Sequence, residues 1–93
     1  MPDIDKQIFK HLCNFISKKW IVNRLDKDGN KVSMSKYADE CDLVKSSIKK
    51  IVDAPEGYQI PLMSLTKICR KEGTTLSELF REFEKVYGVR YDV

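Results

Sequence analysis

The chain has 93 residues, of which 42% are hydrophobic and 33% are charged, and its formal net charge is +3. This length suits one domain over residues 1–93, and the composition is typical of a soluble, helix-rich globule rather than a disordered chain. The pI near 8.8 permits nucleic acid as a partner, although dedicated nucleic-acid binders usually exceed about 9. No apolar run approaches the roughly 20 residues of a membrane span and no secretory signal pattern opens the chain. We therefore expect a cytoplasmic protein without membrane contact.

Apolar residues recur at helical spacing from the start of the chain. The stripe consists of Ile4, Ile8, Leu12, Phe15, Ile16 and Trp20. With Asp3 as the N-cap, this pattern predicts a long first helix over residues 3–24. The end of this helix has an alternative. Residues 20–25 could instead form a strand that returns through 31–33, with residues 26–30 as the hairpin loop.

Two short helices joined by a tight turn are predicted over residues 33–52. Ser33 is a good N-cap for the first of them, and the small Ala38 lies where the helices must approach closely. The second helix covers about residues 44–52 and ends before a segment, 53–57, that contains proline and glycine. This arrangement is typical of the helix-turn-helix, whose second helix enters the major groove of DNA.

Two further helices are predicted after this motif. The first covers residues 61–72 and is closed by Gly73, and the second covers residues 75–87. Thr75 and Glu78 have the spacing of a capping box at the start of the last helix. The sequence as a whole therefore predicts an all-α, compact domain of five helices, in which the second and third form the helix-turn-helix.

The predicted third helix has two chemically different faces. On a helical wheel that advances about 100° per residue, Val44, Ile48 and Ile51 cluster between about 240° and 300°. The face nearly opposite is cationic and rich in hydrogen-bonding groups. It consists of Lys45, Ser46, Lys49 and Lys50. A helix with an apolar anchor and such an outer face fits the major groove, which is about 12 Å wide.

The same region has the residue order of a known family. That order is a Ser cap, a Leu-Ala pair, a Gly-Val turn and two aliphatic core positions three residues apart. The corresponding residues here are Ser33, Tyr37-Ala38, Asp42-Leu43 and Ile48 with Ile51. Residues 65–69 and 73–79 are similar to the family's later helix, link and final helix. Residues 33–80 thus resemble the phage-repressor-like helix-turn-helix family, often called XRE.

The resemblance implies a sequence-specific regulator that binds double-stranded DNA, either a repressor or an antitoxin-like autoregulator, and that binds as a homodimer. The family's base-facing sites correspond to Lys45, Ser46 and Lys49. Residues expected over phosphates are Lys50, Ser47, Ser35 and Lys36, with Tyr58 and Gln59 as weaker candidates. A candidate dimer surface on the last helix consists of Phe83, Val86 and Tyr87.

Several residues depart from the family pattern. Val44 replaces the Ser or Thr that usually caps the recognition helix, and Val52 stands where an acidic residue is frequent. Met34 stands where a Gln often contacts phosphate or base. Asp42 replaces the turn glycine but tolerates the left-handed conformation better than most residues. The departures at Val44 and Met34 favour an alternative function, a protein-interaction module on this fold without specific DNA binding.

No catalytic, metal or cofactor chemistry is expected. The single histidine, His11, has no paired nucleophile, and no glycine-rich phosphate loop is present. In the loop 26–30 the glycine comes at the fourth position, and Tyr37 occupies the twelfth, so the loop does not match a calcium site. The cysteines are widely spaced, without a CxxC pair, and fall in apolar helical positions. We expect Cys13, Cys41 and Cys69 to be buried and reduced.

Overall fold

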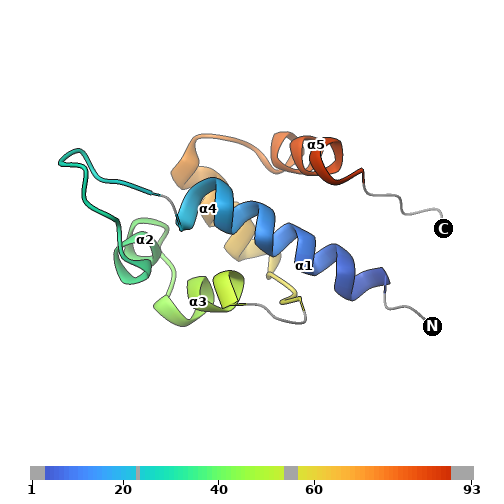
Figure 1. Cartoon of the computed structure of the whole chain (residues 1–93), viewed down its shortest axis with the longest axis horizontal. Helices are drawn as coiled ribbons and strands as arrows, with labels where there is room; N and C mark the ends of the chain where they lie inside the picture. Colours follow the sequence, from blue (N-terminus) through green and yellow to red (C-terminus); the bar gives the residue numbers. More distant parts are fainter. Residues whose placement is uncertain (1–3, 23, 54–56, 89–93) are drawn as a thin grey trace.

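The structure, a computed structural model, describes residues 4–22, 24–53 and 57–88. This part of the chain is all-α, as predicted, and contains α-helices but no strand (Figure 1). The elements are α1 (Ile4–Ile16), the π-helical turn η1 (Ser17–Ile21), α2 (Met34–Glu40), α3 (Lys45–Asp53), α4 (Leu62–Glu72) and α5 (Leu76–Tyr87).

The first helix ends earlier than residue 24, the predicted boundary. After α1 the chain makes a single π-turn, in which the Val22 N–H donates to the Ser17 carbonyl at 2.9 Å. In an α-helix, two residues five apart point in directions that differ by about 140°. In a π-turn, residue i+5 instead points close to the direction of residue i. The turn therefore keeps Ile21 on the face of Ile16, and both are buried. The predicted N-cap, Asp3, lies outside the described residues.

A short hairpin follows η1, but it agrees with the alternative interpretation only in its loop, since residues 20–21 belong to η1 and the described residues form no strand. Leu25 and Lys31 form one isolated antiparallel bridge. The Val32 N–H donates to the Arg24 carbonyl at 2.9 Å, and the Asp26 N–H donates to the Asn30 carbonyl at 2.8 Å. The Arg24 N–H donates to the Ile21 carbonyl at 3.4 Å, a spacing of three residues, so the regular helical bonding has ended before this residue.

The core is formed around α1, which packs against α3 and α5. In Figure 1, α1 runs through the middle of the molecule, with α2 and α3 on one side and α5 on the other. The most deeply buried aliphatic side chains are Ile16, Ile48 and Ile68. The prediction of buried, unpaired cysteines is confirmed, since Cys13, Cys41 and Cys69 are all free thiols in the core.

Side-chain caps fix where α2 and α5 begin. The Ser33 hydroxyl accepts a hydrogen bond from the Lys36 N–H at 3.1 Å. The Thr75 hydroxyl accepts from the Glu78 N–H at 3.2 Å and lies 3.3 Å from the Glu78 carboxylate, to which it donates. The bonds from the Lys36 and Glu78 N–H groups each satisfy a backbone donor that has no partner inside the helix. The caps therefore explain why α2 and α5 begin within one residue of the predicted boundaries.

Candidate nucleic-acid interface

A tight turn joins α2 to α3. Asp42 has φ of 61°, the left-handed conformation expected at this position. The Leu43 N–H then donates to the carbonyl of Ala38 at 2.8 Å. The Ala38 side chain is buried, and α2 and α3 pack directly on each other. The geometry agrees with the predicted helix-turn-helix over residues 33–52.

The two faces of α3 are divided largely as the helical wheel predicts. Ile48 and Ile51 are buried, while Lys45, Ser46, Lys49 and Lys50 are exposed. The side chains predicted to contact bases therefore share the outer surface of one helix, whose inner surface is fixed in the core.

Val44 does not belong to the apolar anchor of α3, which corrects the prediction from the helical wheel. It precedes the first residue of the helix, and its carbonyl accepts from the Ser47 N–H at 3.0 Å. Its side chain is 64% exposed. The reason is that a residue at this position has not entered the helical path, so the wheel does not apply to its side chain.

The residues predicted to reach phosphates are spread over α2 and α3. Ser35 and Lys36 are exposed on α2, whereas Ser47 is half-buried on α3. The Nζ of Lys50 lies 5.7 Å from the ring centroid of Tyr58, in the segment before α4. Such a cation–π contact holds the ammonium group at the surface without neutralising its charge.

The acidic groups near the turn are paired with lysines of α4. Lys67 donates to the Asp42 carbonyl at 2.9 Å and lies 3.4 Å from its carboxylate. The Nζ of Lys71 is 3.9 Å from the Glu40 carboxylate. Within the described ranges, no carboxylate forms an ion pair with a lysine of α3.

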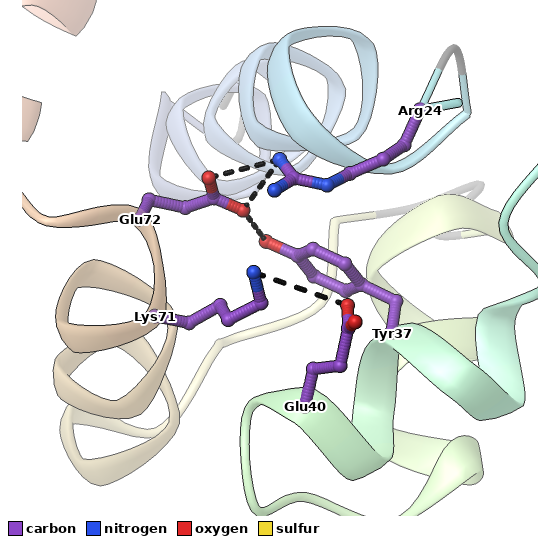
Figure 2. Close-up of polar contacts among 5 residues, drawn as sticks. All are labelled: Arg24, Tyr37, Glu40, Lys71 and Glu72. Carbon is purple, nitrogen blue, oxygen red and sulfur yellow. Dashed lines mark hydrogen bonds and ion pairs between the residues drawn. The ribbon is translucent and has the colours of Figure 1, made fainter. Parts of the chain in front are cut away.

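A buried polar cluster lies behind the helix-turn-helix (Figure 2). The Tyr37 hydroxyl donates to Glu72 Oε2 at 2.7 Å. The Arg24 guanidinium donates to both carboxylate oxygens of Glu72 at 2.9 Å. The Glu72 side chain is only 8% exposed. Burial, and next the bond to Glu72, raise the pKa of Tyr37 well above its usual range, so the phenol stays protonated as the donor.

No pattern in the sequence revealed this cluster. Its members come from the hairpin, α2 and the end of α4, and the Tyr37–Glu72 pair is 35 residues apart in the chain. No spacing rule connects such residues. A conserved triplet in an alignment would be the signal that could reveal them.

The candidate dimer surface on α5 is largely internal, which corrects that part of the prediction. Phe83 is 1% exposed, and its ring centroid lies 5.8 Å from that of Phe15 on α1. Tyr87 stacks on His11 with ring centroids 4.9 Å apart. The helix uses these rings to pack on α1, so only Val86 of the predicted set is exposed.

Comparisons with known protein families, with curated proteins and with solved structures find no match to this chain. Among the described residues, no helix is long and apolar enough to cross a membrane. In the same part of the chain, no group of three or more His, Cys, Asp or Glu side chains is placed to hold a metal ion. The functional argument therefore depends on the geometry and chemistry of α2 and α3.

Proposed function

We propose that the protein is a sequence-specific regulator that binds double-stranded DNA by inserting α3 into the major groove. One observation carries the proposal. The exposed face of α3 bears Lys45, Ser46 and Lys49, while its opposite face is anchored by buried Ile48 and Ile51. The preceding α2 and the left-handed turn at Asp42 hold this helix at the surface in the manner of a helix-turn-helix.

The side chains on this face suit base and backbone recognition. Lysine donates to O6 and N7 of guanine, and serine donates to or accepts from either type of base pair. Lys45, Ser46 and Lys49 are proposed to contact bases. Lys50, Ser47, Ser35 and Lys36 are proposed to contact phosphates, which fix register without reading sequence.

Regulation and dimerisation are part of the same proposal. The residue order of 33–80 resembles that of phage-repressor-like regulators, so the protein would act in the cytoplasm as a repressor or an antitoxin-like autoregulator. As a homodimer it would present two copies of α3 to half-sites about 34–36 Å apart.

A competition binding assay on a selected duplex tests the base contacts. Lys45→Ala with Lys49→Ala should remove the preference for that duplex over unrelated DNA. The matched control is Lys10→Ala with Lys85→Ala, which removes the same charge from exposed positions on α1 and α5 and should retain the preference. Equal preference in both double variants and the unaltered protein would overturn the assignment.

A second candidate, a protein-interaction module, is favoured by an apolar groove elsewhere on the molecule. The groove has a volume of about 300 Å³ and lies between α1, the segment before α4, and α5. Its lining residues are Ile8, Phe9, Leu12, Ile60, Leu65, Phe80 and Phe83. The competition binding assay distinguishes the two functions, because an interaction module would bind duplexes weakly and without sequence preference.

A further inference from the structure

The hairpin between η1 and α2 is internally well ordered. Its ends are joined by the bonds of Val32 to Arg24 and of Asp26 to Asn30. In addition, Asp26 Oδ1 accepts hydrogen bonds of 2.9 Å from the backbone N–H groups of Asp28 and Asn30. Figure 1 shows that this segment projects from the body of the molecule beyond α2. It is therefore a protruding element with a defined shape.

The hairpin and the helix-turn-helix are attached to one side chain. Glu72 accepts from Arg24 at the base of the hairpin and from Tyr37 of α2 (Figure 2). The carboxylate accepts charge-assisted hydrogen bonds from one guanidinium nitrogen of Arg24 and a hydrogen bond from the buried phenol of Tyr37, and so connects both partners. The direction of the hairpin relative to α2 is consequently set by this cluster.

The surface shared by the hairpin and α2 carries exposed cations. Lys27 and Lys31 are exposed on the hairpin, and Lys36 is exposed on α2. Lys27 and Lys36 line one shallow polar hollow of about 340 Å³ between the two elements. Of the acidic groups that line it, Asp26 accepts from two backbone N–H groups and Glu40 lies near Lys71. Asp28 remains as an exposed carboxylate at the tip.

We propose that this hairpin is a second DNA-binding element, which places Lys27 and Lys31 on backbone phosphates beside the groove that α3 enters. This inference rests on the proposed function, because α3 must first set the position of the duplex. A helix inside the major groove leaves the flanking phosphate backbones to the neighbouring elements of the protein. The hairpin adjoins α2, is connected to it through Glu72 and exposes Lys27 and Lys31, and these are the observations that support the inference.

The salt dependence of duplex binding measures this contribution directly. The logarithm of the binding constant falls linearly with the logarithm of the salt concentration. Each lost phosphate contact makes this negative slope shallower by about one. Lys27→Ala with Lys31→Ala should therefore reduce the magnitude of the slope by about two and leave the preferred sequence unchanged. The control, Lys10→Ala with Lys85→Ala, removes the same charge from exposed positions on α1 and α5 and should leave the slope unchanged.

A second variant adds charge at the same tip. Asp28→Lys keeps the backbone N–H that Asp26 binds, and it should steepen the slope by one or more. The inference is overturned if the hairpin variants and the control have the same slope as the unaltered protein while sequence-selective binding persists. If the unaltered protein binds no duplex selectively, the proposed function and this inference both fail, which distinguishes the two results.

Discussion

The hydroxyl of Tyr37 donates a 2.7 Å hydrogen bond to the carboxylate of Glu72, and this bond joins α2 to the last turn of α4. Arg24 completes the cluster by neutralising the carboxylate at 2.9 Å. A buried carboxylate is costly unless it is paired and hydrogen-bonded, and here it is both. The cluster is therefore one polar connection between the helix-turn-helix and the rest of the domain, beside the lysine contacts of α4 with Asp42 and Glu40.

Removing the Tyr37 hydroxyl should destabilise the fold without opening a large cavity. Tyr37→Phe loses a hydrogen bond to a charged group, and we expect the free energy of unfolding to fall by about 1.5–3 kcal/mol. Urea denaturation measures this change. Tyr87→Phe is the matched control, since Tyr87 is half-buried and contacts α1 through its ring. Equal decreases in the free energy of unfolding for the two variants would show that the bond from Tyr37 to Glu72 does not stabilise the fold.

Stability should decrease at alkaline pH. Burial raises the pKa of Tyr37 and of the Cys13, Cys41 and Cys69 thiols. These groups keep their protons in the folded chain at a pH where the unfolded chain has lost them. Stability is therefore full below the unfolded-state values of 9.0 for cysteine and 10.0 for tyrosine, and falls above them by up to about 1.4 kcal/mol per pH unit for each group.

Tyr37→Phe isolates the tyrosine share of this effect. Unfolding measured under reducing conditions between pH 8 and pH 11 should show a shallower decline above about pH 10 in the variant than in the unaltered protein. Parallel curves for the two proteins would contradict a protonated, buried Tyr37.

The turn at Asp42 should tolerate glycine but not a β-branched residue. Its φ of 61° lies in the left-handed region, where a branched side chain is strained by about 1–3 kcal/mol. We expect Asp42→Val to lower the free energy of unfolding by that amount and Asp42→Gly to change it little. Asp39→Val, at an exposed position of α2, should cost only tenths of a kcal/mol. Thermal unfolding measures both changes. If Asp39→Val and Asp42→Val lower the stability equally, the left-handed backbone at Asp42 is not the cause.

A larger side chain at Ala38 should separate α2 from α3. Ala38 is 1% exposed, so Ala38→Leu would overpack the contact at a cost of about 1–3 kcal/mol. Asp39→Leu adds a similar side chain at a neighbouring exposed position and should be nearly neutral. Chemical denaturation of both variants checks the difference, and the expectation fails if Ala38→Leu is as stable as its neighbour.

Much of the fold follows from local patterns. Ser33 and Thr75 fix helix starts by caps that involve residues three apart, and the spacing of Ile48 and Ile51 identifies the inner face of α3. Asp42 was assigned to the turn from the residue order of the resembling family, and its tolerance of the left-handed conformation agrees with that position. Each of these features depends on a few consecutive residues, which is why a single sequence reveals it.

The features that the sequence did not reveal depend on tertiary contacts. The first helix ends in a π-turn, after which Arg24 pairs with Val32 across the hairpin, a contact that helical spacing does not predict. The Arg24–Tyr37–Glu72 cluster joins segments that no periodicity relates. The exposure of Val44 depends on where α3 begins, and the burial of Phe83 depends on the rings of α1.

Selection of binding sites from random DNA duplexes tests the central claim, sequence-specific recognition by α3, most directly. Performed at two salt concentrations, it separates base recognition from attraction to the backbone. We predict an enriched motif that persists at the higher concentration, with half-sites about 10–10.5 base pairs apart or at a multiple of that spacing. We also predict that this motif is lost in the protein carrying Lys45→Ala and Lys49→Ala. Absence of any enriched motif at both salt concentrations would contradict the central claim.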